Sequence, residues 1–211
     1  GKFRRDWNPV TASQAQYSGT NWPIIRYSDV LLMFAEAENE LNNGPTAAAK
    51  AAFEQVRLRA FGGNASLIGT TPSDYNGFFE AIVKERMLEF CGEGIRKYDL
   101  IRWNRLKTNL DAVKEELLKM SRREAPYDNL PTTMYYKTGM TTMQYANSFY
   151  KPTPSGGAPA GYASMSWVGS GIETTIVAYL GSHFEAGKSE LLPLPQGSID
   201  ANPKLTQDYG Y

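Results

Sequence analysis

An apolar pattern with helical spacing runs from about residue 28 to about residue 124, and it limits the chain to a mainly α-helical fold. Ser28 is a good helix cap, and the Asn-Asn-Gly-Pro of residues 42–45 is a stop signal, so a first helix is expected between them. Thr46 caps a second helix that ends at the Gly-Gly of residues 62–63. The short polar connection predicts an antiparallel helical hairpin.

The second helix carries a weak repeat motif. Ala49 and Phe53 lie four residues apart, as in the second helix of a tetratricopeptide repeat. Three further helices are expected, over about 75–91, 95–103 and 109–123. The side chains expected to face the core are Val30, Phe34, Ala37 and Leu41; Ala49, Phe53, Val56 and Ala60; Phe78, Ile82, Val83, Met87, Leu88 and Phe90; Tyr98, Leu100 and Ile101; and Leu110, Val113, Leu117 and Met120. Cys91 is expected to be buried among them.

Beyond Glu124 the helical spacing is lost and the composition changes. Residues 125–190 hold 7 of the 44 charged residues but 7 of the 13 tyrosines. The high aromatic content favours long ordered loops, with one short strand at 172–180, where β-branched residues gather. The chain is therefore expected to consist of a helical body (28–124), a loop-rich aromatic region (125–190) and a closing tail (191–211).

Charge and composition exclude several classes of function. The formal net charge is zero, which argues against a nucleic-acid partner. One cysteine and one histidine exclude a disulfide framework, Cys-rich zinc modules and sites that need two imidazoles. No apolar run approaches the roughly 18 residues needed to cross a bilayer.

Two patterns approach known catalytic or binding motifs. Residues 181–189 end in Gly-Lys-Ser, but the first glycine of a phosphate-binding loop is misplaced, and the prolines at 193 and 195 cannot open the required helix. His183 is expected to be a surface or loop residue. Glu85, Glu89 and Glu93 lie on one helix face beside Arg86, where two carboxylates could serve glycoside hydrolysis, although a solvated, salt-bridged face is the favoured interpretation.

Three stretches carry a more specific pattern. They cover residues 23–37 with 40–42, residues 85–103, and residues 191–211. In this order they resemble the C-terminal half of the SusD/RagB family of nutrient-binding lipoproteins on the outer surface of Bacteroidetes-type outer membranes. The middle stretch matches the family's E-R-x-x-E…G-x-R-x-x-D-L-x-R-W signature at Glu85, Arg86, Glu89, Gly94, Arg96, Asp99, Leu100, Arg102 and Trp103.

The resemblance implies a fold and a location. The fold is a SusD-like α-α superhelix of tetratricopeptide-like hairpins with a loop-rich aromatic C-terminal region. Residues 1–211 then form a C-terminal domain, and the N-terminal half, with its lipoprotein signal and acylated cysteine, is absent from this chain. Membrane association is expected only through that lipid anchor, on the cell surface at the outer membrane.

The resemblance also implies an activity. The protein is expected to bind a glycan or another nutrient and to deliver it to a SusC-like TonB-dependent transporter, without catalysis, cofactor or metal. The alternatives are a helical-repeat module for protein interaction and a glycoside hydrolase using Glu85 and Glu89. Sugars bind to aromatic rings beside amide and hydroxyl groups. The candidate ligand-binding residues are therefore Tyr135, Tyr136, Tyr145, Asn147, Tyr150, Tyr162 and Trp167.

Overall fold

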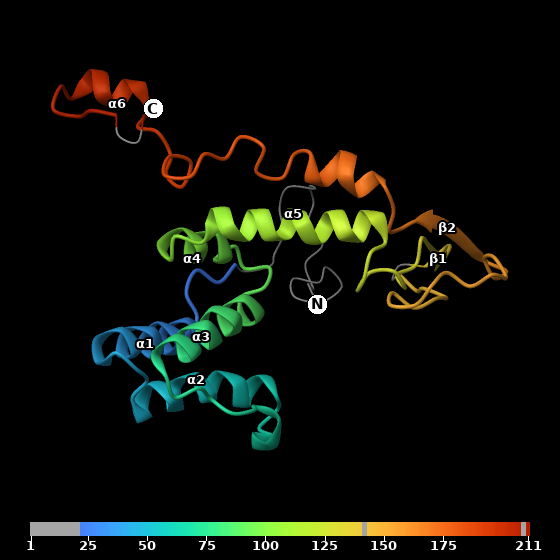
Figure 1. Ribbon diagram of the computed structural model, residues 1–211, viewed down its shortest axis with the longest axis horizontal. Helices are drawn as coiled ribbons and strands as arrows, with labels where there is room; N and C mark the ends of the chain where they lie inside the picture. The colour runs from blue at the N-terminus through green and yellow to red at the C-terminus, as the bar shows by residue number, and fades with distance from the viewer. Residues whose placement is uncertain (1–21, 141–142, 208–209) are drawn as a thin grey trace. The chain divides into compact units, whose positions relative to one another are not determined.

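The computed structural model describes residues 22–140, 143–207 and 210–211, and the chain divides into two compact units, Gly1–Asp99 and Leu100–Tyr211 (Figure 1). The fold is mainly α-helical, which confirms the predicted class. Among the described residues, no helix combines the length and the apolar character needed to cross a bilayer.

The first unit is built on the predicted helical hairpin. Helix α1 (Tyr27–Asn42) packs against α2 (Ala47–Ala60), and α3 (Tyr75–Glu89) also packs against α1 (Figure 1). A short 3₁₀ turn, η2 (Ala65–Leu67), lies between α2 and α3, and α4 (Arg96–Arg102) begins at the end of this unit. The local sequence explains the helix ends. Thr46 Oγ1 accepts a hydrogen bond from Ala49 N at 3.1 Å, and Asp74 Oδ1 accepts one from Gly77 N at 2.7 Å.

The start of α1 differs from the prediction. The cap residue is Arg26, whose side chain makes no capping hydrogen bond, and Ser28 lies inside the first turn. Ser28 Oγ instead accepts a hydrogen bond from the guanidinium of Arg26 at 3.1 Å. The side chain of Ser28 is therefore used to orient Arg26 rather than to cap the helix.

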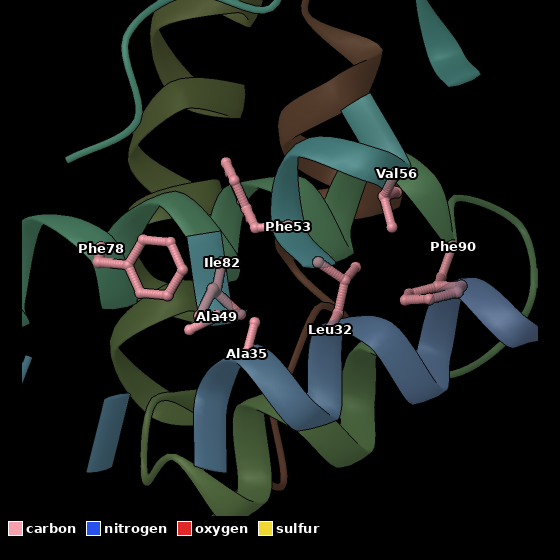
Figure 2. Packing of buried hydrophobic residues seen from close by; sticks show 8 residues of the cluster. All are labelled: Leu32, Ala35, Ala49, Phe53, Val56, Phe78, Ile82 and Phe90. Atoms are coloured by element: carbon pink, nitrogen blue, oxygen red, sulfur yellow. The ribbon is translucent and has the colours of Figure 1, made fainter. Parts of the chain in front are cut away.

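The core of the first unit gathers side chains from all three long helices (Figure 2). Phe53 and Phe78 meet edge to face with ring centroids 5.4 Å apart, an arrangement that suits the charge distribution of aromatic rings. The buried cluster consists of Leu32, Ala35, Ala49, Phe53, Val56, Phe78, Ile82 and Phe90. Ala49 and Phe53 thus have the buried positions that the tetratricopeptide-like motif predicts.

The predicted inner face of α1 is wrong. The buried residues are Asp29, Leu32, Ala35 and Asn39, whereas Val30, Phe34, Ala37 and Leu41 are exposed. Apolar spacing did not identify this face because half of it is polar: Asp29 pairs with Arg86, and Asn39 Nδ2 donates to Tyr75 O. Ala60 of α2 is also exposed.

The face predicted for α3 is only partly right. Phe78, Ile82, Val83 and Phe90 are buried, but Met87 and Leu88 are exposed, while Glu85, Arg86 and Glu89 are buried. The predicted face is therefore salt-bridged but not solvated, because each of these groups has a partner on another element: Arg57 for Glu85, Asp29 and Asp99 for Arg86, and Arg26 and Arg59 for Glu89. Other predicted core residues that are exposed are Cys91, Tyr98 and Val113.

The second unit contains α5 (Leu106–Arg122), the strands β1 (Thr133–Lys137) and β2 (Tyr162–Ser166), the π-helix η3 (Glu173–Val177) and α6 (Gln196–Ala201). Helix α5 packs against η3 (Figure 1). The strand predicted at 172–180 is wrong. The hydroxyls of Thr174 and Thr175 donate to the carbonyl oxygen of Gly171. These local side-chain hydrogen bonds favour the helical turn over an extended strand. Strands β1 and β2 lie where only loops were predicted.

The closing tail folds back on itself around α6. The side-chain amide of Gln207 accepts from Leu194 N at 3.0 Å and donates to Leu194 O at 2.6 Å. The hydroxyl of Tyr211 donates to Leu191 O at 2.9 Å. Within the third matched stretch, Asp208 and Tyr209 lie outside the described residues.

Candidate ligand-binding site

Strand β1 is the central element of a small antiparallel sheet that holds most of the predicted ligand-binding residues. On one edge it pairs with β2, with Tyr136 opposite Ala163 and Lys137 opposite Tyr162. On its other edge it meets residues 144–146, through a bridge between Tyr136 and Tyr145. The hydrogen bonds on that side run from Lys137 N to Gln144 O at 2.9 Å and from Ala146 N to Tyr135 O at 2.9 Å. Residues distant in the loop-rich region are thus brought beside one strand.

The sheet divides the predicted tyrosines between its two faces, because side chains alternate along a strand and paired residues share a face. Tyr136 and its bridge partner Tyr145 lie on one face. Tyr135 and Tyr162 lie on the other, the latter opposite Lys137. The predicted residues therefore do not form one continuous surface.

One face carries a compact cluster of aromatic rings, which we call the ring cluster: Tyr145, Phe149 and Trp167. Ring centroids are 4.9 Å apart for Tyr145–Phe149, 5.6 Å for Phe149–Trp167 and 6.4 Å for Tyr145–Trp167. The rings are inclined to one another by 51° to 68°. Phe149 and Trp167 keep 38% and 39% of their surface exposed, so ring area is available to a ligand while the cluster holds each ring in place.

Phe149 was not among the predicted residues. The prediction selected tyrosines, a tryptophan and an asparagine, all of which have a polar atom, and Phe149 has none. Its position four residues after Tyr145 in an aromatic-rich stretch is the only sequence signal that could have identified it. Tyr150, which was predicted, is 83% exposed beside the cluster in sequence.

Asn147 holds the loop of the ring cluster on β1. Its Oδ1 accepts from Tyr135 N and its Nδ2 donates to Thr133 O, both at 2.9 Å. Thr153 Oγ1 accepts from Thr133 N at 3.0 Å, and it lies 3.1 Å from Thr133 O, to which it donates. The two side chains reproduce the bonds of a neighbouring strand. Both ends of the Asn147 amide group thus bond to β1, and these bonds position Tyr145 and Phe149 on either side of it.

The surroundings of the ring cluster carry little charge. Between residues 129 and 172 the only residues that are charged at neutral pH are Lys137 and Lys151. Lys137 lies on the sheet face opposite Tyr145, by strand alternation. A ligand that covers the rings therefore displaces water from few charged groups, which keeps the desolvation cost low.

The carboxylates that could have served hydrolysis are held in ion pairs in the first unit. Glu85 pairs with Arg57 at 2.9 Å, and Glu89 pairs with Arg26 at 2.8 Å and with Arg59. Burial raises the pKa of Glu85 in spite of its arginine partner. Burial also acts to raise the pKa of Glu89, but the hydrogen bonds from Arg26 and Arg59 outweigh it and the pKa is lowered.

Arg86 is one of the most deeply buried charges of this network. It is 3% exposed, and its Nη1 and Nε lie 2.7 Å from Asp29 Oδ1 and Asp99 Oδ2. Its guanidinium carbon and that of Arg26 each lie 5.0 Å from the centroid of the Phe90 ring. The charges of the 85–103 stretch thus join α1, α3 and α4, which supports a structural role for the signature.

The 181–189 segment, which approaches a phosphate-binding motif, is held by local hydrogen bonds. In the 181–189 segment, Gly187 N donates to Glu190 Oε1 at 3.0 Å and Glu185 N donates to Ser189 Oγ at 3.0 Å, and residues 190–195 form no helix. His183 is exposed, as predicted. Within the described ranges, no group of histidine, cysteine, aspartate or glutamate side chains is arranged to hold a metal ion.

Comparisons with known proteins agree with this architecture. A sequence model described as the SusD family matches residues 1–211. "SusD-like protein P25" of Formosa agariphila is 43% identical over 112 residues, which cover 52% of this chain and 20% of that protein. A crystal structure of a SusD homolog from Bacteroides thetaiotaomicron superposes with a TM-score of 0.54 at 26% identity, over 90% of this chain and 27% of that one.

The matched segments thus cover only 20% and 27% of these two relatives, both of which are much longer than this chain. The family match nevertheless extends over every residue of the chain, and the matched helical fold is the one described above. On these grounds the chain belongs to the SusD family.

Proposed function

We propose that the protein binds a glycan or another nutrient at the cell surface, and that the ring cluster of this chain is one of its ligand contacts. The observation that carries the proposal is the partly exposed group of Tyr145, Phe149 and Trp167 in a stretch of low charge. Sugar rings present apolar C–H faces that stack on aromatic rings, and their hydroxyl groups need neighbouring polar atoms. Among the other predicted tyrosines, Tyr150 follows Phe149 directly in the chain, and Tyr136 is bridged to Tyr145 in the sheet.

The remaining predicted residues have different places in the proposal. Tyr135 and Tyr162 lie on the opposite sheet face, and Tyr135 is also buried. Asn147 is proposed as a positioning residue, because both ends of its amide bond to β1.

The proposal for the whole protein rests on family membership. We propose that this chain is the C-terminal part of a longer, lipid-anchored protein at the outer membrane, which hands its ligand to a SusC-like TonB-dependent transporter without chemical change. The relatives' greater length supports the first point. The ion pairing of Glu85 and Glu89 supports the absence of hydrolysis.

Binding of soluble oligosaccharides to the full-length protein tests the ring cluster. Trp167→Ala should weaken binding to any glycan that the unaltered protein retains, by the roughly 1–3 kcal/mol that an aromatic ring at a binding site contributes. Tyr179→Ala is the control. Tyr179 is an exposed aromatic residue just after η3, and it lies outside the ring cluster. Isothermal titration against a broad glycan panel gives both affinities.

Two results would contradict the proposal in different ways. Equal affinities for the Trp167→Ala and Tyr179→Ala proteins would remove the ring cluster from the ligand site. Release of shorter sugars by the unaltered protein, abolished by Glu89→Gln, would replace the binding function with hydrolysis.

A further inference from the structure

The ring cluster is assembled from both edges of strand β1. Tyr145 and Phe149 come from the segment that meets one edge, and Trp167 comes from the end of β2, which pairs with the other edge. The rings of Phe149 and Trp167 nevertheless lie only 5.6 Å apart, centroid to centroid. Their relative position therefore depends on how each of the two segments is fixed to β1.

Residues 147–153 form an arc that is tied to β1 at both ends, and Phe149 lies within it. At the start of the arc, Asn147 Nδ2 donates to Thr133 O at 2.9 Å. At its end, Thr153 Oγ1 donates to the same carbonyl oxygen at 3.1 Å and accepts from Thr133 N at 3.0 Å. A carbonyl oxygen has two lone pairs, so these two donors use its full acceptor capacity. Fixing the arc at both ends restricts the positions that Phe149 can adopt.

The peptide group between Thr132 and Thr133 connects Thr153 to Trp167. Its N–H donates to Thr153 Oγ1 at 3.0 Å, and its carbonyl oxygen, that of Thr132, accepts from Trp167 N at 2.8 Å. A peptide group is planar and rigid, so a rotation that breaks one of these hydrogen bonds also disturbs the other. The hydroxyl of Thr153 and the backbone of Trp167 thus hold one rigid group from its two sides.

We infer that Thr153 is a positioning residue for the ring cluster, and that it fixes Phe149 relative to Trp167 before a ligand binds. Thr153 has no aromatic surface of its own, so its effect on a ligand is exerted through the rings. A surface that already has its bound arrangement loses less conformational entropy on binding, and this raises the affinity. The inference rests on the proposed function, because it assumes that the ligand contacts the ring cluster.

Titration of the full-length protein with one oligosaccharide tests the inference. The probe is the member of the glycan panel that the unaltered protein binds most tightly. Thr153→Val keeps the shape of the side chain but removes its hydrogen bonds, and it should weaken binding by about 5- to 10-fold. Thr153→Ser restores the hydroxyl and should return the affinity to within about 2-fold of the unaltered protein. Thr153→Ala, which also lacks the hydroxyl, is measured as well, so that a folding defect of one variant does not decide the result.

Thr138→Val is the matched control. The Thr138 hydroxyl also donates to a backbone carbonyl oxygen, that of Gly161, and it lies just beyond the opposite end of β1. This variant loses the same chemical group from the same sheet without releasing the 147–153 arc. Its affinity for the probe should therefore equal that of the unaltered protein.

Two further measurements separate positioning from a general loss of structure. In a Trp167→Ala protein, adding Thr153→Val should change the affinity by less than about 2-fold, because the distance between the two rings no longer matters. Fluorine-19 NMR of protein labelled with 5-fluorotryptophan reports on the ring without any ligand. The Trp167 resonance, identified by its absence from a Trp167→Phe protein, should shift in Thr153→Val and stay in place in Thr153→Ser and Thr138→Val.

The outcomes distinguish failure of this inference from failure of the proposed function. If Trp167→Ala weakens binding but Thr153→Val does not, or weakens it no more than Thr138→Val, the inference is overturned and the ring cluster remains the ligand contact. An equal loss from Thr153→Val with and without Trp167, or an unshifted Trp167 resonance, would also overturn it. Unchanged affinity in Trp167→Ala would remove the ring cluster from the ligand site, and the inference would fall with the proposed function.

Discussion

At the scale of single residues, Arg86 shows how a buried charge is tolerated. Its guanidinium donates to Asp29 and to Asp99, and the ring of Phe90 lies against it. Burying a charge without partners is very costly, so each partner is needed for the arrangement to persist. The charged signature of the 85–103 stretch is therefore a packing element, although its residue types look like those of a catalytic or solvated face.

Asp99→Asn should destabilise the protein strongly. Removing one partner from a buried ion pair costs about 3–5 kcal/mol, and the lower end is expected here because Asp29 still faces Arg86. Asp111→Asn is the control, since its pair with Lys107 is half exposed on α5 and contributes about 0.3–0.5 kcal/mol. Urea unfolding gives both free energies, and similar values for the two variants would contradict the structural role of Asp99.

Glu85 and Glu89 should respond to pH with opposite signs. The pKa of Glu89 is lowered below its ordinary 4.5, so its ionised form stabilises the protein above that pH and the contribution is lost as the pH falls through the lowered pKa. The pKa of Glu85 is raised, so its ionisation removes stability as the pH rises from about 4.5 through the raised value.

Glutamine variants separate the two effects. Glu89→Gln should be less stable than the unaltered protein at neutral pH, with a deficit that shrinks in acid. Glu85→Gln should gain stability relative to the unaltered protein as the pH rises from acid to neutral. Free energies of unfolding measured from pH 3 to 7 test both, and parallel pH profiles for the two variants would refute the opposed pKa directions.

At the scale of elements, the turn that follows η3 packs closely on α5, because the backbone at Gly181 lies against the side chain of Leu110. Gly181 has φ +60°, and a Cβ at this position would lie 3.2 Å from Leu110 Cδ1 on α5. Both the left-handed backbone and the contact distance favour glycine. This pairing is invisible in sequence patterns, because Leu110 and Gly181 are far apart in the chain.

Gly181→Ala should destabilise the second unit. The left-handed backbone alone costs about 1–2 kcal/mol for alanine, and the contact with Leu110 adds to it. Gly187→Ala isolates the first effect, since φ is +82° but nothing lies within 4 Å of its Cβ position. Gly156→Ala has neither feature and should stay within about 0.5 kcal/mol. Thermal melting should therefore rank Gly181→Ala below Gly187→Ala, and Gly156→Ala highest; any other order contradicts the packing argument.

The sheet of the second unit also depends on contacts between elements far apart in the chain. Strands β1 and β2 have only five residues each and are separated by a long connection, so neither alternation nor a tight turn marks them in the sequence. Asn147 and Thr153 supply strand-like hydrogen bonds from side chains. Such bonds between distant residues cannot be read from local propensity, and they decide which aromatic rings meet.

At the scale of the whole molecule, the chain belongs to a family whose matched members are several times longer. Its two units each bury apolar residues of their own. The ligand contact proposed above lies wholly in the second unit.

The sequence by itself determined the helical class, the hairpin, the cap at Thr46 and the family, because these depend on local spacing, short-range hydrogen bonds and short matched stretches. It also indicated that the aromatic stretch of low charge is the place to look for a ligand. Only the tertiary structure decided which face of α1 is buried, since that face includes Asp29 and Asn39, whose partners Arg86 and Tyr75 lie far along the chain. It likewise decided that Glu85, Arg86 and Glu89 are inside, and that Phe149 joins Tyr145 and Trp167. These outcomes depend on contacts between residues far apart in the chain, and no local pattern encodes them.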